Sequence, residues 1–321
     1  MKSGISRFLC KATVSLVVMF GAGNAQANEF VTFGGGSSGG AFFTIAAGMA
    51  RVVEKNVENV QATARVTAAT TENTRLLGRE RIQFALAAAS GPYSAASGLP
   101  PFKDESYTNV RYIATGYSSP FQIVVHADSE VQSLADLPGR RVGVLLGITA
   151  QDWFPRLAEV YGVAGKFETF ELGAGELMTS LRDGNIDVAV ISASAPSPAI
   201  SDLATSRSVR FIPIGTEEAN KMISTTHPFF YIDVIPAGTY PGQDKDVQSI
   251  LNPILLITHA NVSTDLVYNV TKVLLDTHHA DMSAIHPNAG RFRVENAGKS
   301  MVIPPHPGAV KFYKEHGIEL K

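Results

Sequence analysis

The sequence has almost no cysteine, since Cys10 is the single one among 321 residues. This residue precedes the apolar run near the N-terminus, in a segment that we expect to be removed on export. The mature chain would then have no disulfide, no nucleophilic thiolate and no cysteine-based zinc site. Its stability would have to come from burial, and about 290 residues are enough for a large core and for two domains.

Charge is also scarce, with 17% charged residues and a formal net charge of -2. Lysine and arginine are scattered and form no basic stripe, which disfavours nucleic acid as a partner. The loosely grouped His278, His279 and His286 lack the i, i+4 spacing that places two imidazoles on one helix face. We therefore predict no metal site and no cofactor.

Long apolar runs are lacking beyond the first residues of the chain. Lys2, Arg7 and Lys11 precede an apolar run from Ala12 to Ala22, which is too short to span a bilayer, and Ala25-Gln26-Ala27 follows it. This pattern predicts a signal peptide over residues 1–27, cleaved after Ala27, and a periplasmic mature protein. An uncleaved anchor is the alternative, but no stop-transfer flank follows the run.

Along the rest of the chain, short apolar runs that predict strands alternate with segments whose apolar residues recur at helical spacing. This alternation is typical of doubly wound α/β domains. The first unit has strands and helices separated by loops of small residues. The expected elements are a strand at Phe30–Phe33, a helix at Ala41–Asn56, a strand at Val60–Val66, a helix from Glu72 to Leu77 and a strand at Ile82–Ala87.

A similar unit recurs about a hundred residues later, which predicts two similar lobes. Its expected elements are a strand at Arg141–Leu145, a helix at Gln151–Tyr161, a strand at Lys166–Phe170, a helix at Gly175–Leu181 and a strand at Asp187–Ile191. Phe121–His126 and Pro253–His259 are plausible crossover strands that join the lobes as a hinge. We expect the first lobe to comprise residues 28–121 and 254–321, and the second lobe residues 122–253.

Ligands of open α/β sheets bind beyond the carboxyl ends of the strands, so the loops there are the candidate site. Four such loops consist almost entirely of small residues: Gly34–Gly40, Ala89–Ser94, Leu146–Thr149 and Ser192–Pro198. Small residues allow main-chain N–H groups to approach a ligand, and three of the loops open helices whose N-termini favour anions. The pattern predicts a small, acidic ligand.

The glycine loop also matches two enzyme signatures. Gly34, Gly36 and Gly39 satisfy the dinucleotide fingerprint G-x-G-x-x-G, but the acidic residue expected after the second strand is missing. Ser37 lies in a G-x-S-x-G sequence, so an exported serine hydrolase is the alternative function, although no oxyanion motif precedes it. A surface protein with a vestigial cleft is a third class.

Several longer strings carry a resemblance to a known family. These are Phe33–Phe43, Glu72–Leu77, Leu134–Val142, Asp183–Asp187, Ile235–Gln243 and Ile303–Ala309. With them the chain resembles the TAXI family, the TRAP-associated extracytoplasmic immunogenic proteins. The resemblance implies a type II periplasmic binding fold, no catalysis, and delivery of a small acid such as glutamate or a dicarboxylate to a TRAP membrane permease.

Two departures from that family's pattern affect the expected ligand. Phe42-Phe43 stands where the family usually has two tyrosines, and Leu146-Gly147-Ile148-Thr149 replaces a more polar turn. Both changes remove polar donors, so the ligand should be smaller or less polar than glutamate. We expect a monomer whose binding residues are Gly36, Ser37, Ser38, Gly39, Phe42, Phe43, Asn73, Ser90, Tyr117, Gly147, Ile148, Thr149, Gln151, Ser192 and Ser194.

Overall fold

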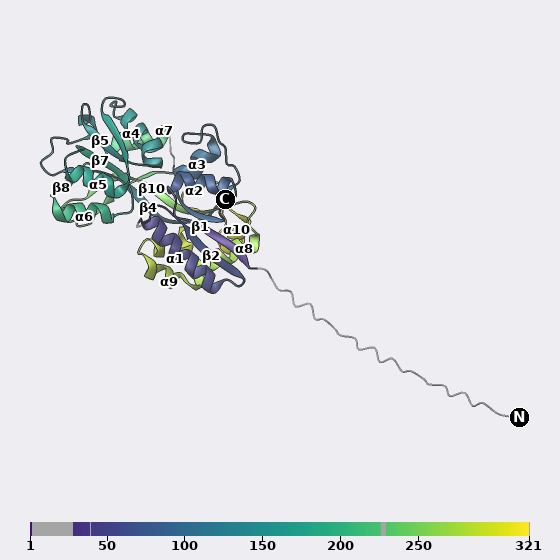
Figure 1. Cartoon of the computed structure of the whole chain (residues 1–321). Coiled ribbons are helices and arrows are strands. Elements are labelled where there is room, and N and C mark those ends of the chain that lie inside the picture. The colour runs from purple at the N-terminus through teal and green to yellow at the C-terminus, as the bar shows by residue number, and fades with distance from the viewer. Residues whose placement is uncertain (2–27, 39, 226–228, 321) are drawn as a thin grey trace.

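The computed structural model describes Met1 and residues 28–38, 40–225 and 229–320, so the predicted signal peptide lies outside the described residues apart from Met1. Two α/β lobes lie side by side, and two long strands pass between them (Figure 1). This arrangement confirms the predicted fold class. Within the described part of the chain, no helix is both long and apolar enough to cross a membrane.

Three parallel strands in the order β2-β1-β3 form the first lobe's part of the sheet. The elements are β1 (Glu29–Gly34), α1 (Ala41–Asn56), β2 (Val60–Arg65), α2 (Thr70–Gly78), β3 (Phe84–Ala88) and α3 (Ser90–Ser97). Helix α1 buries Ile45, Met49, Val52 and Val53, which recur at helical spacing. All five residues of β3 are buried, as expected for a strand covered on both faces.

The second lobe repeats this arrangement with the parallel order β6-β5-β7. Its elements are η1 (Leu134–Asp136), β5 (Arg141–Leu145), the π-helical turn η2 (Thr149–Trp153), α4 (Phe154–Val160), β6 (Glu168–Leu172), α5 (Ala174–Arg182), β7 (Val188–Ser192) and α6 (Pro198–Ser206). The predicted repeat is therefore confirmed. One predicted helix is different in detail, because residues 149–153 form a π turn before α4 begins.

Two long antiparallel strands join the lobes: β4 (Val110–His126) and β10 (Val247–His259). From Val110 to Pro120, β4 pairs with β10, and from Phe121 onward it pairs with β7 and with the short β8 (Val209–Phe211). Strand β10 pairs with β3 at one end and with β9 (Tyr231–Ile235) at the other. The predicted lobe boundaries at 121/122 and 253/254 stay a proposal that rests on these changes of partner.

Several helices that the sequence did not predict complete the lobes. They are α7 (Thr216–Thr225), α8 (Thr264–Lys272), the π turn η3 (Val273–Thr277), α9 (His279–Ile285), η4 (Ala289–Arg291), η5 (Val294–Asn296) and α10 (Pro307–Glu315). The C-terminal ones cover the first lobe, with α9 against α1 and α10 against α8 (Figure 1). Helix α7 packs on α4 in the second lobe.

Aromatic side chains pack together where β4 crosses between the lobes. Phe121, where β4 changes partners, stacks on Trp153 with ring centroids 3.7 Å apart, and both side chains are buried. Phe230, the residue before β9, packs edge-on against Phe121. Large buried aromatic side chains contribute strongly to packing, so β4 is held to the π turn η2 at the position where β4 changes partners.

Helices α8 and α10 approach each other so closely that Gly308 has no room for a side chain. A Cβ at Gly308 would lie 2.4 Å from the Thr264 carbonyl oxygen and 2.7 Å from the Tyr268 nitrogen, both main-chain atoms. We expect Gly308→Ala to lower the free energy of unfolding by about 1–3 kcal/mol, because the helices must move apart.

Gly175, in the first turn of α5, is the matched control because an added Cβ would meet nothing within 4 Å. Gly175→Ala should raise the free energy of unfolding by about 0.4–1 kcal/mol, since alanine restricts the unfolded chain. Urea unfolding of the two variants measures both effects. Equal stability of the two variants would contradict the tight α8–α10 packing.

Candidate functional site

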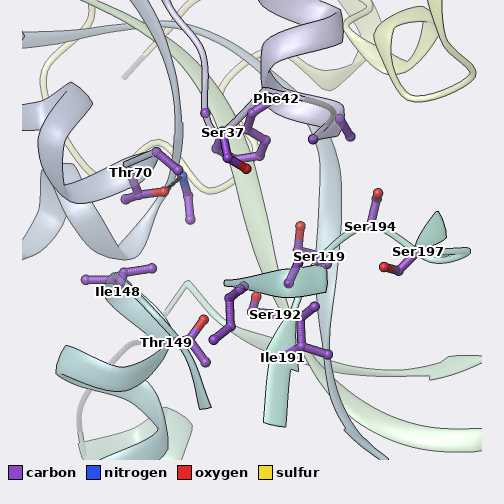
Figure 2. Close-up of a pocket in the computed structure, with 18 of the residues that line it drawn as sticks. Ser37, Phe42, Thr70, Ser119, Ile148, Thr149, Ile191, Ser192, Ser194 and Ser197 are labelled. Atoms are coloured by element: carbon purple, nitrogen blue, oxygen red, sulfur yellow. Dashed lines mark hydrogen bonds between the residues drawn. The ribbon is translucent and has the colours of Figure 1, made fainter. Parts of the chain in front are cut away.

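A cavity of about 270 Å³ lies between the two lobes, beside the crossing strands. Figure 2 shows Ser37, Phe42 and Thr70 on one side of it and Ile148, Thr149 and Ser192 on the other. The residues that line it come from the loops after β1, β2, β5, β6 and β7, and from β3, β4 and β10. Both lobes therefore contribute to one site that is open to solvent on one side.

The serine and threonine hydroxyls around this cavity fall into two sets. On the first lobe, Thr67 donates to the Gly35 carbonyl at 3.0 Å, and Thr70 accepts from the Ala88 N–H at 3.0 Å, so both stabilise the loops. The second set lacks side-chain hydrogen bonds to any described residue and comprises Ser37, Ser119, Thr149, Ser192, Ser194 and Ser197. Four of these six belong to the second lobe, so that lobe supplies most of the free hydroxyl donors.

Four helices begin at the cavity, and their N-terminal residues line it. They are α1 after Gly40, α2 after Ala69, α5 after Gly173 and α6 after Ser197, and each of these described cap positions lacks a side-chain hydrogen bond to the helix. The first N–H groups of a helix have no partner within it, and the helix dipole places partial positive charge there. The cavity thus presents main-chain donors from both lobes.

The described residues bring no formal charge to the wall of this cavity. Among the described residues around it, none is Asp, Glu, Lys, Arg or His. Tyr117 is the one residue there with a titratable side chain, and burial raises its pKa above the ordinary tyrosine value, so its hydroxyl stays neutral. Phe42, Ile148, Ile191 and Ile254 add apolar surface. The site therefore combines neutral donors with an apolar wall.

Eight of the predicted binding residues line the cavity: Gly36, Ser37, Phe42, Tyr117, Ile148, Thr149, Ser192 and Ser194. Ser38 lines an adjoining groove that also includes Glu176 and Arg182. Gly39 lies outside the described residues. Whether any of these residues contacts a ligand stays a prediction.

The structure places the other five predicted residues away from the cavity wall. Asn73 is fully buried and donates to the Gly35 carbonyl at 2.6 Å and the Leu86 carbonyl at 2.8 Å. Ser90 is buried and accepts from Asn252 Nδ2 at 3.0 Å. The backbone of Phe43 packs against Gly35, so that a Cβ on this glycine would come within 2.8 Å of Phe43 Cα.

Gly147 and Gln151 lie where the lobes meet. The Thr71 hydroxyl donates to Gln151 Oε1 at 3.4 Å, across from the first lobe to the second. Gly147 has a φ of +95°, and a Cβ there would lie 3.8 Å from the Ala68 carbonyl oxygen. These residues form contacts between the lobes beside the cavity.

Several residues that line the cavity were not predicted from the sequence. The stretch from Thr67 to Thr70 follows β2, and Ser119 lies within the long strand β4. Ser197 belongs to the predicted loop Ser192–Pro198 but was not among the predicted binding residues; it precedes Pro198, the first residue of α6, and such a Ser-Pro pair is a helix-start signal. Ser119 gives no such signal, because its position depends on where β4 crosses between the lobes.

The serine hydrolase alternative requires a base beside Ser37. Activated serine nucleophiles are paired with an adjacent general base, most often histidine. The described lining of the cavity includes no histidine or carboxylate, but Ser37 also lines the adjoining groove, where Glu176 and Asp202 lie. No cluster of three or more metal-ligating side chains occurs in these described residues either. Among the described residues, no hydrogen bond joins the Ser37 hydroxyl to a histidine or a carboxylate, as an activated serine would need.

Two α/β lobes with a site between them at a two-strand crossing have the fold of periplasmic binding proteins. The chain belongs to the NMT1-like family, which matches residues 33–317. The narrower resemblance to the TAXI family stays a prediction.

Solved structures with low sequence identity share this fold. One is a binding protein component of an ABC phosphonate transporter from Pseudomonas aeruginosa, with 12% identity, coverage of 83% of this chain and 80% of that chain, and a TM-score of 0.52. Another is XAC2383 from Xanthomonas citri bound to ATP, with 10% identity, coverage of 89% and 94%, and a TM-score of 0.52. At this identity the likeness shows the fold alone.

The two buried hydrogen bonds of Asn73 indicate that this residue stabilises the fold, and a substitution tests this role. Asn73→Ala removes two buried hydrogen bonds that connect the glycine loop, α2 and β3, so we expect a loss of about 1–3 kcal/mol in the free energy of unfolding. Asn185→Ala, at an exposed position of the second lobe, should change it by less than about 0.5 kcal/mol. Chemical denaturation measures both, and equal losses would contradict the structural role of Asn73.

Proposed function

We propose that this chain is an exported periplasmic solute-binding protein that captures a small organic acid between its lobes and delivers it to a membrane permease. The observation that carries the proposal is the uncharged cavity, in which helix N-termini and free hydroxyls from both lobes converge. A site of this kind binds by multiple neutral donors and supplies no base for catalysis.

The chemistry of the cavity narrows the ligand class. Each helix N-terminus favours an anionic group by about 0.3–2 kcal/mol, depending on burial. With no lysine or arginine among the described lining residues, a second carboxylate would lose its hydration without a counter-charge. Phe42, Ile148, Ile191 and Ile254 offer an apolar surface to the rest of the ligand. We therefore infer a monocarboxylate with a small apolar body, less polar than glutamate.

The proposed export and the proposed partner rest on observations other than the cavity. The basic and apolar pattern at the start of the sequence supports a cleaved signal peptide and a periplasmic location. The resemblance to the TAXI family supports a TRAP permease as the partner, whereas the Pseudomonas aeruginosa protein of the same fold is a component of an ABC transporter. A TRAP permease is the partner that we propose.

Lobe closure is the proposed mechanism of capture. The Thr71–Gln151 hydrogen bond and the close approach of Gly147 to Ala68 are contacts between the lobes beside the cavity. A ligand that contacts both walls at once stabilises the closed form in proportion to its preference for that form. Closure would then signal to the permease that the site is occupied.

The single tryptophan of the sequence allows binding to be followed directly. Trp153 ends the π turn that begins with the cavity residue Thr149, and its ring stacks on Phe121. Titration of the mature protein with acetate, pyruvate, 2-oxoisovalerate, benzoate, succinate and glutamate should change its emission. We expect saturation at micromolar concentrations, about -8 kcal/mol, for at least one monocarboxylate.

The corresponding amides are the matched controls, because they keep the shape and lose the charge. Weaker binding of the amide supports recognition of an anion by helix N-termini. Tighter binding of succinate or glutamate than of every monocarboxylate would contradict the inferred ligand class. Failure of every acid to change the emission or to stabilise the protein thermally would contradict the binding function itself.

Thr149 supplies the test of the second-lobe hydroxyls. Thr149→Val keeps the shape of this buried residue and removes a hydroxyl without a described protein partner, so the affinity for the acid should fall about 2- to 13-fold, equivalent to 0.5–1.5 kcal/mol. Thr63→Val, on the exposed face of β2, is the control and should leave the affinity unchanged. Calorimetric titration distinguishes the two, and an unchanged affinity for Thr149→Val would remove this residue from the site.

A further inference from the structure

A second hollow, a groove of about 890 Å³, lies against the crossing strands and differs in chemistry from the cavity. Its lining includes Gly116, Tyr117 and Ser118 of β4, Tyr231 of β9, and residues between Ser283 and Ser300 from the C-terminal part of the first lobe. Tyr117 lines both hollows, so they are neighbours. We call this hollow the basic groove.

Three cations line the basic groove: Arg291, Arg293 and Lys299. All three are exposed, and among the described residues none of them forms an ion pair with a carboxylate. Aspartate and glutamate are absent from the groove's described lining. Three like charges around one hollow repel each other and raise the local concentration of anions.

Hydrogen bonds to β4 attach the segment that carries these cations. The Thr115 hydroxyl of β4 donates to the Lys299 carbonyl, and the Gly298 N–H donates to the Tyr112 hydroxyl at 3.1 Å. Arg293 Nε donates to the Gly290 carbonyl at 2.8 Å, which leaves the outer nitrogens of its guanidinium group free. The segment is thus attached to β4, and the Lys299 ammonium group donates to Asn296 Oδ1 at 2.9 Å.

Polar neutral groups complete the groove. The hydroxyls of Ser118, Ser283 and Ser300 and the amide of Asn296 belong to its lining, and Tyr231 donates to Ser118 at 2.9 Å. Arginine forks match the oxygens of phosphate and carboxylate groups, and hydrogen bonds between ionised partners are about twice as strong as neutral ones. The groove therefore offers more than one oxyanion contact.

We propose that the basic groove is a second binding site, for a small anion that carries two or three charges, such as phosphate or a tricarboxylate. The cavity and the basic groove would then bind anions of different charge and polarity. The cavity accepts a singly charged, partly apolar acid, whereas the groove accepts a strongly charged polar anion. This proposal does not depend on the function that we assign to the cavity.

The test is isothermal calorimetry of the mature protein with inorganic phosphate and with citrate, at low ionic strength. We expect binding of at least one of them that weakens as salt is added, since exposed charges are screened. Arg291→Gln/Arg293→Gln should weaken this binding about tenfold or more. Arg51→Gln/Arg207→Gln, with the same charge change at exposed positions outside the groove, should leave the affinity unchanged.

A third variant separates the two sites. Ser192→Phe adds bulk to the cavity wall and should abolish binding of the monocarboxylate while phosphate or citrate binding persists. Thermal unfolding verifies that each variant is folded before its titration is interpreted. Absence of anion binding to the wild type, equal weakening in the two arginine pairs, or loss of anion binding in Ser192→Phe would each overturn the proposal.

Discussion

The antiparallel pairing of β4 with β10 is the interaction on which the rest of the structure depends. Strand β10 pairs with β3 of the first parallel unit and β4 pairs with β7 of the second, so the pairing of β4 with β10 joins the two units into one sheet. Main-chain hydrogen bonds along the crossing resist sliding, while the two strands alone can bend. The cavity lies beside this crossing because the carboxyl ends of the parallel strands of both units face it.

The cavity and the basic groove illustrate two ways to attract an anion. Inside the cavity, uncapped helix N-termini and hydroxyls provide partial charges that need no counter-ion when the site is empty. In the groove, full charges stay exposed to water, where their repulsion is screened. A buried guanidinium in the cavity would carry a large desolvation cost before ligand binding, which the neutral donors avoid.

Sequence reasoning predicted the repeated units well, because their strands are short apolar runs bounded by glycine and their helices have a clear period. The bounds of α1 agree residue for residue. Sequence reasoning predicted only the part of β4 from Phe121 to His126. It missed the part that begins at Val110, because Gly116, Ser118 and Ser119 interrupt the apolar pattern there. Asn73 was expected in the site, yet its polar side chain satisfies buried carbonyls instead, and a sequence does not distinguish these two uses of a polar residue.

Closure of the lobes around an acid is the central claim, and a distance across the mouth of the cavity tests it most directly. Val66 and Leu146 are exposed residues in the loops after β2 and β5, and the sequence has no cysteine apart from Cys10. Spin labels on Val66→Cys and Leu146→Cys would report their separation by pulsed electron resonance. The account predicts a broad distribution without ligand that narrows and shortens on addition of the monocarboxylate that changes Trp153 emission. A distribution unaffected by that saturating ligand would contradict it.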